Sequence, residues 1–528
     1  MSLSDSIAKA VANPATDDAF DIHTALDEVL GTIGLNRADT GGSFTFRGAD
    51  PIVPSTLRLG AATSLALATK SAAVAALWRQ RGGRGQDISM DLRVAPHRLC
   101  PFYDQKWELL NGYPGGAPSV PTLAFVNGFY RTADDRWVMP LNPYPNLRIA
   151  AERLLGVPED PDAVAAAIGT WRAAELEEAA ERAGVVLPMI RTPQEFLKER
   201  QFTEVLSGMP LVEITRIGDS DPEPLPTVGA GATAPLAGVR ALGMGHIIAG
   251  AGAGRALALH GADVLNLWRP GELEHPVTYN TTQVGVRSAT VEPRTAEGAA
   301  VIRALLAGAD VFYANRRPGL LASMGLSEDE AIDLRPGLVH ATVSLHGTTG
   351  PWANRIGFDQ TAGSVAGLLH LEGDGDRPAL PPITVVNDYL VAWFLTAGIV
   401  EAMRRRAVDG GSYRVHVSLT RVALWILSLG VFDKAYATAV AGTGDEHAYL
   451  DPETFTARTP LGDYQGVTDQ IRMSETPGAY RHVLLPRGSS RPTWESAARA
   501  GARRRPDYIV PKGRKASRAE ESRPCGSI

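Results

Sequence analysis

The sequence predicts an α/β protein with a larger domain built on a parallel β-sheet and a smaller α+β domain. Three observations support this prediction. Strand-like and helical segments alternate from residue 236 to about 345, and strands separated by helices of this length favour parallel, right-handed βαβ units. A stretch rich in Pro, Gly, Thr and Ala at 218–235 reads as a linker. The segment before that linker combines a candidate hairpin with helical periodicity.

The first part of the chain contains a pattern that returns later. The segments "AALWRQRGGRGQDISMDL" (75–92) and "EAMRRRAVDGGSYRVHVSL" (401–419) each predict an apolar helix that ends in arginines, a Gly-rich turn and a short strand. With Gly85 set against Ser412, the offset is 412 − 85 = 327. The chain therefore carries a weak internal repeat.

The same offset aligns the apolar helices predicted at 59–78 and 389–403. Asp388, the lone carboxylate that opens the second helix, then falls on position 388 − 327 = 61, which is alanine. The two copies differ at the one charged position that packing alone would not require.

The middle and later elements follow in order. Residues 121–141 predict a hairpin with the turn "RTADDR", and 160–206 predict helices rich in Ala, Glu and Arg. After the linker we expect the strand "GVRALGMG", the Gly-rich turn and helix "AGAGAGRALALHG", the strand "ADVLNLW", the helix "AEGAAVIRALLAG", and the strands "ADVFYANR" and "GLVHATVSL".

Length and composition limit the function classes. A chain of 528 residues exceeds one ordinary core, so two or more domains are expected. A net charge of −6 gives no reason to expect nucleic acid as a partner. The apolar runs 389–400 and 422–432 are too short to cross a bilayer, and the acidic N-terminal residues lack a signal-peptide core. We therefore expect no membrane association.

Cysteine content and missing motifs exclude further classes. Cys100 and Cys525 cannot form a disulfide framework or a thiolate metal site, which fits a reducing cytoplasm, and we expect a cytoplasmic protein without a metal. The sequence has no G-x-S-x-G elbow, no G-K-[ST] phosphate loop and no H-E-x-x-H zinc pair. The sequence therefore does not support a serine hydrolase, a P-loop ATPase or a zincin.

The glycine run "AGAGAG" (249–254) lies between a predicted strand and helix. Free N–H groups and the helix dipole favour phosphates at such a position, although small residues chosen for close helix–strand packing would give the same pattern. The next strand ends at Arg269, where a dinucleotide-binding site needs an acid for the ribose. A cation suits a nucleotide phosphate better, so no nicotinamide cofactor is expected.

Two further positions are candidate site residues. Arg316, Arg317 and Pro318 follow a strand and form either a rigid cationic ligand edge or a plain surface turn. Asp388 suits a helix N-cap that accepts backbone N–H bonds. A carboxylate at a helix N-terminus is also expected to have a lowered pKa and to stay ionised, as a nucleophile requires. The two roles of Asp388 are compatible, and local chemistry does not separate them.

These pieces, in this order, resemble the class III CoA-transferase family, which includes formyl-CoA and carnitine CoA-transferases and the related alpha-methylacyl-CoA racemases. The segments that carry the resemblance are "GHIIAGAGAGRALALHGADVLNLWRPGE", "GVRSATVEPRTAEGAAVIRALLAGADVFYANRRPG" and "MGLSEDEAIDLRPGLVHATVSLHGTTGPWANRIGFD". In the family, the nucleophilic aspartate opens a helix 29 positions after the acid of a "Y/H-E/D" pair. Here the pair is Phe358-Asp359, and 388 − 359 = 29.

The resemblance implies a Rossmann-like CoA domain and transfer of CoA from an acyl-CoA thioester to a carboxylic acid through an aspartyl covalent intermediate. Asp388 would be the nucleophile and Asp359 the assisting acid. Coenzyme A or acyl-CoA would enter as co-substrate, with no metal. The implied CoA-contacting positions are Ile248, Ala249, Gly250, Arg269, Asn315, Arg317, Pro318 and Met324.

Three positions depart from the family pattern. Phe358 replaces the histidine base that racemases place before the first acid, Ser323 replaces a CoA-contacting arginine, and Ile248 replaces a glutamine common in transferases. Two alternatives stay open: an acyl-CoA racemase or isomerase that uses Asp388 as a base, and a non-catalytic acyl-CoA-binding protein. The resemblance implies a substrate pocket lined in part by the small domain, whose aromatic residues, such as Tyr130, Trp137 and Tyr144, are more often core than ligand contacts.

The resemblance also makes the domain order unusual, because the family's small domain is inserted in the large one and two chains interlock. We expect a homodimer or an intrachain pseudo-dimer with one live site between its halves. The expected layout is 1–120, a degenerate and helical partial copy of the large domain; 121–217, the small domain; 218–235, a linker; 236–430, the CoA-binding domain; and 431–528, a closing segment with a loose basic tail.

Overall fold

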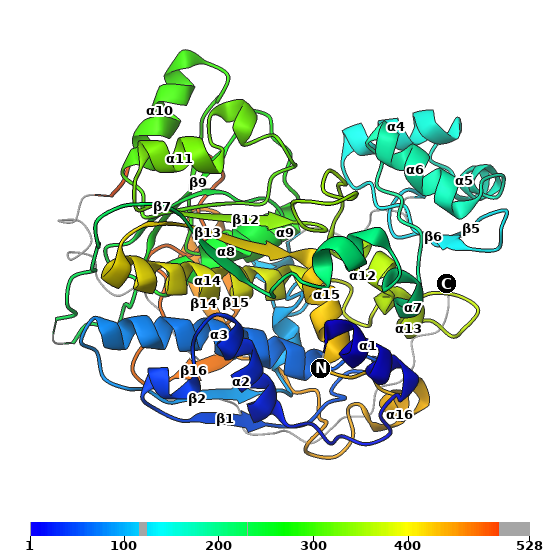
Figure 1. Cartoon of the computed structure of the whole chain (residues 1–528), viewed down its shortest axis with the longest axis horizontal. Coiled ribbons are helices and arrows are strands. Elements are labelled where there is room, and N and C mark those ends of the chain that lie inside the picture. The colour runs from blue at the N-terminus through cyan, green and yellow to red at the C-terminus, as the bar shows by residue number, and fades with distance from the viewer. Residues whose placement is uncertain (1, 116–123, 230, 496–528) are drawn as a thin grey trace.

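A seven-stranded sheet forms the centre of the larger domain (Figure 1). The computed structural model describes residues 2–115, 124–229 and 231–495. In these ranges, six strands of the sheet run parallel, and β7 (Glu213–Gly218) pairs antiparallel with β13 (Ser412–Ser418) at one edge. The order is β10 (Arg287–Thr290), β9 (Asp263–Trp268), β8 (Arg240–Met244), β11 (Val311–Ala314), β12 (Val339–Ser344), β13 and β7.

Different helices cover the two faces of this sheet. α8 (Ala249–Leu259) and α14 (Asn387–Asp409) pack on one face, whereas α10 (Ala296–Ala307) and α11 (Glu328–Leu334) cover the other (Figure 1). Because the inner strands are buried on both faces, they can be continuous apolar runs, such as "VFYA" in β11, rather than alternating ones. The predicted strand–helix alternation over this region and the parallel sheet are confirmed.

Helix α3 (Leu59–Gln80) packs along α14 and is buried except for its last two residues. By length and hydropathy, it is the one helix in the described ranges that could span a membrane. The two apolar runs considered from the sequence, 389–400 and 422–432, do not include α3. Its apolar window lies entirely inside the protein, so burial in the core accounts for its hydropathy.

Strands from both ends of the chain share two smaller sheets. One sheet joins β1 (Phe44–Arg47), β2 (Ile88–Asp91) and β16 (Ile471–Met473). The other contains β14 (Thr454–Thr459), β15 (Gly462–Val467), β3 (Leu109–Leu110) and β4 (Tyr113–Pro114). The first 120 residues were predicted as a helical partial copy with one short strand within 75–92. That strand is present as β2. Three further strands, β1, β3 and β4, were not predicted, because strands of two to four residues are too short to show a pattern.

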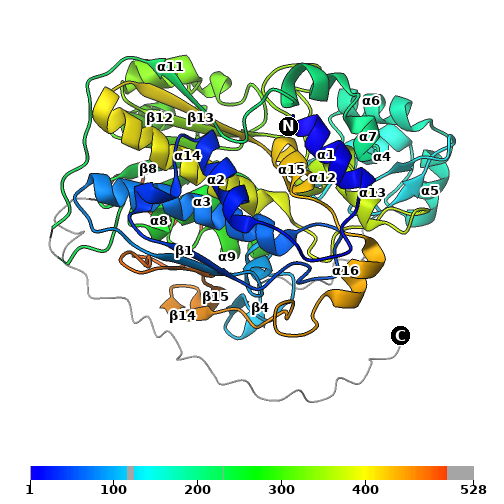
Figure 2. The ribbon, with the colours of Figure 1, turned by 60° about the horizontal axis from the view of Figure 1, so that its bottom comes forward.

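Helices from the same two ends pack beside these sheets. α2 (Ile22–Thr32) lies on α3, and α1 (Leu3–Ala12) lies on α15 (Leu419–Ser428) (Figure 2). α16 (Lys434–Val440) belongs to the closing segment. The two chain ends therefore fold as one layer beneath α14.

Buried ion pairs join the two chain ends to each other within this layer. Lys70 Nζ of α3 lies 2.6 Å from Asp469 Oδ2, and Arg98 Nε lies 3.4 Å from Asp469 Oδ1. All three side chains are buried. Removing one partner of such a pair leaves an uncompensated buried charge, which typically costs about 3–5 kcal/mol.

The smaller domain has a core of its own and sits to one side of the sheet (Figure 1). The predicted hairpin is present as β5 (Tyr130–Arg131) and β6 (Trp137–Val138), with the turn between them. Its helices are α4 (Pro145–Leu155), α5 (Pro161–Ile168), α6 (Ala173–Ala183) and α7 (Pro193–Phe196), followed by a π-helical turn at Phe202–Leu206. Arg355 of the larger domain reaches Glu177 at 3.3 Å and Glu181 at 2.9 Å on α6.

Two features of the predicted layout need comment. The expected boundary at 217 cuts through β7, which pairs with the large sheet and so belongs to it structurally. The sequence analysis also missed β10, a four-residue strand after α9 (Pro276–Thr282). The start of the predicted hairpin at 121–123, Cys525 and the basic tail from 496 lie outside the described residues.

Candidate active site

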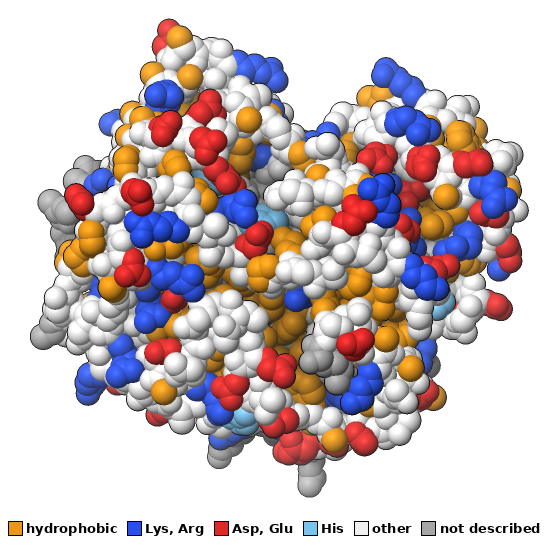
Figure 3. Space-filling view, in the orientation of Figure 1, with side chains coloured by type: hydrophobic (Ala, Val, Ile, Leu, Met, Phe, Trp, Pro, Cys, Tyr) orange, Lys and Arg blue, Asp and Glu red, His pale blue; other side chains and the backbone are white. Residues whose placement is uncertain are grey.

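A cavity of about 1120 Å³ lies between the small domain and the carboxyl ends of the parallel strands. Figure 3 shows the surface hollowed between the lobe of α10 and α11 and the lobe of α4 to α6. Open α/β sheets bind ligands at this edge. The cavity wall includes Tyr144, Asn146, Leu147 and Val186 of the small domain, and His246, Ile248, Ala249, Arg269, Asn315, Arg317, Pro318, Phe358 and Asp388 of the larger one.

Asp388 reaches this cavity from the first turn of α14, which begins one residue earlier at Asn387. The side chain is 8% exposed. The N-cap residue of α14 is Val386, whose apolar side chain makes no hydrogen bond to the helix. Asp388 lies in the first turn and does not act as the cap. The carboxylate is therefore not engaged in holding its own helix, contrary to the predicted capping role.

Asp359 supplies the cap instead. It is the first residue of α12 (Asp359–Ala366), and its Oδ2 accepts the backbone N–H groups of Val386 at 3.1 Å, Asn387 at 2.5 Å and Asp388 at 2.8 Å. Three N–H groups that would otherwise lack partners at the start of α14 are satisfied by one carboxylate. The predicted pair is thus brought together, but Asp359 holds the helix and is not part of the cavity wall.

The protonation of this pair follows from burial. Burial, and secondarily the charge of Asp359, hold the pKa of Asp388 well above its ordinary value. Burial raises the pKa of Asp359 to about 6, against the opposing effect of its three N–H bonds. The expected lowering of the Asp388 pKa by the helix N-terminus is wrong, because the N–H groups of the first turn point to Asp359.

The start of α3 repeats this arrangement without its reactive member. Asp50 accepts the N–H groups of Gly60 at 3.0 Å and Ala61 at 2.7 Å, just as Asp359 accepts those of Asn387 and Asp388. Gly60 and Ala61 correspond to Asn387 and Asp388 at the offset of 327 residues, whereas Asp50 and Asp359 lie 359 − 50 = 309 positions apart. Ala61 is buried in an apolar cluster with Ile52, Leu92, Phe20, Ile22 and Phe46, so this second position is filled rather than open.

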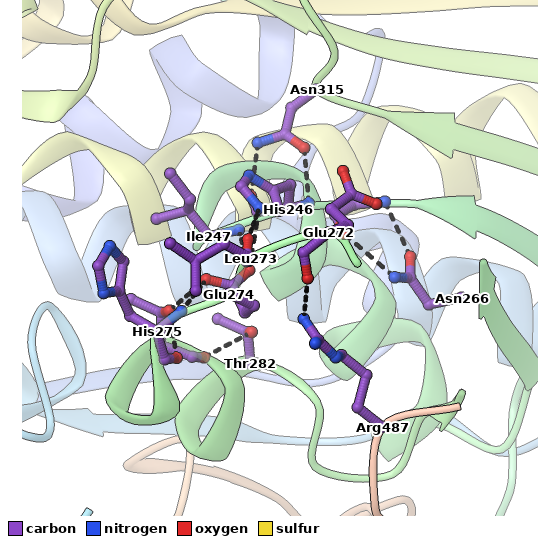
Figure 4. Close-up of polar contacts among 12 residues, drawn as sticks. His246, Ile247, Asn266, Glu272, Leu273, Glu274, His275, Thr282, Asn315 and Arg487 are labelled. Atoms are coloured by element: carbon purple, nitrogen blue, oxygen red, sulfur yellow. Dashed lines mark hydrogen bonds and ion pairs between the residues drawn. The ribbon is translucent and has the colours of Figure 1, made fainter. Parts of the chain in front are cut away.

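The loop from Gly245 to Ile247 leads from β8 into α8 and is held by side chains on three sides (Figure 4). Asn266 bonds to both backbone groups of Gly245 at 2.8 and 3.1 Å. Asn315 does the same for His246 at 2.8 and 2.7 Å, and Glu274 Oε2 accepts the N–H of Ile247 at 2.9 Å. Asn315, predicted as a ligand contact, therefore also fixes the backbone of this loop.

Ile247 has a φ of +59°, which a β-branched residue adopts only under strain. Such backbone costs of order 1–3 kcal/mol and persists where its surroundings over-determine it. The next residue, Ile248, is the N-cap of α8 and gives it no side-chain bond. The strained loop thus presents an uncapped helix start beside the cavity, where Ile248 and Ala249 form part of the wall.

The glycines of "AGAGAG" serve close packing. A Cβ on Gly250 would lie within 2.6–2.9 Å of the Asn315 side chain, and one on Gly252 would lie 2.9 Å from Ala392 Cβ of α14. The packing alternative from the sequence analysis therefore applies to both residues. Gly250 lies behind the wall rather than on it.

The predicted cations differ in their availability. Arg316 is bound internally, to Glu272 and, through Nε at 2.7 Å, to the carbonyl of Met244. Arg269 is 3.3 Å from Glu272 and partly exposed. Arg317 is exposed, lies on the cavity wall next to Pro318, and has no ion pair within the described ranges. Arg317 is therefore the cation most available to an anionic ligand.

Met324 does not line the main cavity. It borders a smaller cavity together with Met244, Trp268, Arg269 and Arg316. Arg269 and Arg316 line both cavities, so the predicted CoA contact at Met324 lies next to the main cavity and not on its wall. Among the described residues, no group of three or more His, Cys, Asp or Glu side chains gathers as metal ligands do.

An aromatic cluster on the cavity wall was not predicted as part of the site. Tyr144 of the small domain stacks near Phe358, with ring centroids 6.2 Å apart, and lies 5.6 Å from His246 and 5.1 Å from His275. The sequence analysis read Tyr144 as core because an isolated tyrosine carries no positional signal. Only the docking of the small domain brings it to the cavity.

Comparison with known proteins shows which proteins part of this chain resembles. Residues 236–464 match the model of CoA-transferase family III. The alpha subunit of succinyl-CoA–L-malate CoA-transferase from Chloroflexus aurantiacus is 30% identical over 241 residues, covering 42% of this chain and 56% of that protein. Human succinyl-CoA:glutarate CoA-transferase is 28% identical over 188 residues, covering 33% and 43%. The match over residues 236–464 confirms the predicted resemblance to CoA-transferase family III.

These matches cover only part of each protein. The chain spans about half the length of the curated relatives it matches, 56% and 43% in the two cases above. Among solved structures, a CAIB/BAIF family protein from Brucella suis is 25% identical, with a TM-score of 0.35 over 44% of this chain and 65% of that one.

Proposed function

We propose that this protein transfers CoA from an acyl-CoA thioester to a carboxylic acid, with Asp388 as the covalent nucleophile. The observation that carries the proposal is the division of labour between two carboxylates. Asp359 takes the three N–H groups at the start of α14, so the Asp388 carboxylate is left facing the cavity. The family match over 236–464 supports a thioester of CoA as the substrate.

In the proposed reaction, an ionised Asp388 carboxylate attacks the thioester carbonyl and forms an acyl-aspartyl anhydride, and the CoA thiolate leaves. The thiolate then attacks the aspartyl carbonyl, which gives an aspartyl-CoA thioester and releases the donor acid. The acceptor carboxylate attacks the aspartyl carbonyl of this thioester, which gives a second anhydride and frees the CoA thiolate. The thiolate then attacks the acceptor carbonyl of that anhydride, which gives the new acyl-CoA and restores the Asp388 carboxylate. A thioester is exchanged for a thioester, so no ATP is consumed.

The residues present fit a CoA substrate. Arg317 and Arg269 supply positive charge on the same wall as Asp388, and the uncapped start of α8 adds N–H donors that favour anions. Tyr144, His246 and Phe358 supply an aromatic wall for an acyl group or acceptor. The shape of this wall would select the donor and acceptor acids, which a screen of acids can identify.

Label exchange tests the proposal. Each ¹⁴C-labelled acid from a panel of monocarboxylic and dicarboxylic acids is incubated with its own unlabelled acyl-CoA and the protein. We expect label to enter the acyl-CoA pool with wild type and not with Asp388→Ala. Failure of every acid in the panel to exchange, although acyl-CoA binds, would contradict the proposal.

A second candidate function is supported by one observation. The raised pKa of Asp388, caused first by burial and then by Asp359, suits a group that takes and returns a proton during the reaction. An acyl-CoA racemase or isomerase would use it in this way. Phe358 stands where racemases carry their second base, which weighs against this candidate. Wash-in of deuterium at the α-carbon of a bound acyl-CoA, without label exchange, would favour it.

The assembly follows as part of the proposal. The filled position at Ala61 and the open one at Asp388 support one working site per chain, at the junction of the small and larger domains. We expect either a monomeric pseudo-dimer or a homodimer of such chains, located in the cytoplasm. Light scattering of the purified protein distinguishes the two assemblies.

A further inference from the structure

Three polar side chains form a row across neighbouring strands of the large sheet. His416 on β13 lies between Glu213 on the edge strand β7 and Ser344 at the end of β12. His416 Nδ1 is 3.0 Å from Glu213 Oε2, and His416 Nε2 is 2.9 Å from Ser344 Oγ. Neither residue type nor spacing in the sequence indicated this row, because its members lie far apart in the chain.

The row has the order of a nucleophile, a base and an orienting acid. A neutral imidazole whose Nδ1–H donates to the Glu213 carboxylate leaves Nε2 as an acceptor for the Ser344 hydroxyl. This is the arrangement that activates a serine toward a carbonyl carbon, and such arrangements are recognised by geometry rather than by chain order.

Each member is held in place by the sheet. Glu213 is paired directly with His416 across the two strands, and Arg414 donates to its second oxygen, Oε1, at 3.0 Å. The hydrogen bond with His416 lowers the pKa of Glu213, so this carboxyl stays ionised. His416 is 1% exposed, and the N–H of Gly347 donates to Ser344 Oγ at 2.9 Å. The imidazole is therefore fixed in orientation.

The row opens to the same cavity as Asp388. Both Ser344 and His416 belong to the cavity wall, and Ser344 is only partly buried. Thr348 lies on the same wall, and within the described ranges its backbone N–H has no recorded acceptor. A backbone donor near the serine is what a developing oxyanion needs.

We infer that Ser344, His416 and Glu213 form a second nucleophilic site in this cavity, which hydrolyses acyl-CoA thioesters by way of an acyl-serine. The inference rests on the proposed function in one respect only, namely that the cavity binds acyl-CoA. It does not require Asp388 to act.

The chemistry balances with water as the one co-reactant. Ser344 Oγ attacks the thioester carbonyl while His416 Nε2 takes the hydroxyl proton, and the C–S bond breaks. The imidazolium returns that proton to the departing thiolate, which leaves as CoA thiol. His416 then takes a proton from water as the water oxygen attacks the serine ester, and the ester bond breaks. Ser344 recovers the proton, and the acid is released as its carboxylate.

The test uses the full chain in the Asp388→Ala background, so that hydrolysis of an aspartyl intermediate cannot contribute. Release of CoA thiol from acetyl-CoA and succinyl-CoA, without acceptor acid, is compared with that of Asp388→Ala/Ser344→Ala and Asp388→Ala/His416→Gln. Asp388→Ala/Ser428→Ala is the matched control, since Ser428 donates to the Trp425 carbonyl on α15, outside the cavity wall. Thermal unfolding and calorimetric binding of CoA accompany each variant.

We expect hydrolysis in the Asp388→Ala protein and the control, and a loss of about 10²-fold or more in the Ser344 and His416 variants. Intact mass should reveal an acyl group on Ser344 that persists longer in His416→Gln. A fluorophosphonate reagent should label Ser344, and bound acyl-CoA should protect it.

Two results would overturn the inference. The first is equal release of CoA thiol by the Asp388→Ala protein and by its Ser344→Ala variant. The second is that bound acyl-CoA releases no CoA thiol and the fluorophosphonate labels nothing. Either result rules out this hydrolytic site and leaves the proposed transferase unaffected. If neither thioester binds at all, the proposed function fails as well. If label exchange depends on Asp388 but release of CoA thiol does not depend on Ser344, the proposed transferase stands and the hydrolytic site fails.

Discussion

At the scale of single residues, two carboxylates 29 positions apart divide two tasks. Asp359 satisfies the backbone at the start of α14, and Asp388 faces the cavity without such partners. Burial raises the pKa of both groups, and the charge of Asp359 raises that of Asp388 further. The fold therefore disfavours the ionised form of Asp388, and the protein gives up some folding stability for a reactive carboxylate.

Asp388→Asn should abolish label exchange, by about 10³-fold or more, and yet stabilise the fold at neutral pH. Because the folded state holds the Asp388 proton to a higher pH than the unfolded state, stability falls as pH rises above the ordinary aspartate pKa. The neutral amide removes this loss. We expect a higher Tm than wild type at pH 7.5 and a smaller difference at pH 4. An equal or lower Tm at pH 7.5 would contradict the assigned protonation.

Asp359→Asn should shift the pH dependence of the reaction. The amide oxygen still accepts N–H bonds, but the negative charge that raises the Asp388 pKa is gone. The fraction of ionised Asp388 then increases at a given pH. The acid limb of the kcat profile should move to lower pH, without reaching the ordinary aspartate range, because burial is the larger cause. A profile identical to that of wild type would show that the two groups are not coupled.

Much of this pair could be predicted from the sequence, and its electrostatics could not. The spacing from Asp359 to Asp388 and the position at a helix start are local features. Which carboxylate receives the N–H groups depends on how α12 approaches α14, which no local pattern contains. The same holds for Tyr144, since only domain docking brings it to the cavity wall.

At the scale of elements, the loop before α8 is a strained backbone held by side chains. Glu274 accepts the N–H groups of Ile247 at 2.9 Å and His275 at 2.8 Å, and the hydroxyl of Thr278 at 2.7 Å. The left-handed conformation of Ile247 depends on such support.

Glu274→Ala should release this loop and weaken acyl-CoA binding more than it slows turnover. Losing the acceptor of two backbone N–H groups costs about 1–3 kcal/mol for each group left unpaired. We expect KM for acyl-CoA to rise about tenfold or more, with a lower Tm. Glu274→Gln, which keeps an acceptor oxygen, is the control and should lie near wild type. Equal kinetics for Ala and wild type would contradict a role for this loop.

The first copy of the repeated helix offers a second test at this scale. Ala61→Asp restores the residue type of Asp388 at the start of α3, but the surroundings are apolar and Asp50 is adjacent. We expect no additional activity and a destabilisation of about 3 kcal/mol by urea unfolding, with Ala61→Ser as the milder control. A gain in label exchange in the Asp388→Ala background would instead show a latent second site.

The repeat itself was visible in the sequence because a helix, a glycine turn and a strand share a recognisable order. α3 with β2 and α14 with β13 both have this plan, and Asp50 and Asp359 cap them alike. The short strands β1, β3 and β4 were not predicted. β1 pairs with β2 over only four residues, β3 pairs with β15 more than 350 residues away, and β3 and β4 share a two-residue ladder.

At the scale of the whole molecule, residues 236–464, which match the family model, pack against parts of the chain that lie outside that range. α14 packs along α3, and Asp469 of the closing segment is buried with Lys70 and Arg98 of the first 120 residues. The small domain supplies one side of the cavity. The site therefore depends on parts of the chain that lie outside 236–464.

A chain cut to residues 229–528 should accordingly lack activity and lose cooperative unfolding. It would expose the apolar side of α14 and leave Asp469 without its buried partners. Calorimetry and label exchange on this fragment, with residues 2–228 added back as a separate chain, check the prediction. Full activity of the fragment alone would contradict the pseudo-dimer arrangement.

One measurement tests the central claim most directly. Wild type and Asp388→Ala are incubated side by side with a panel of acyl-CoA thioesters, quenched with hydroxylamine or borohydride, and analysed by intact mass and peptide mapping. The account predicts a trapped modification on the peptide that contains Asp388 in wild type, and none on that peptide in the variant. Bound acyl-CoA with an unmodified Asp388, or an identical adduct in the variant, would contradict covalent transfer through this residue.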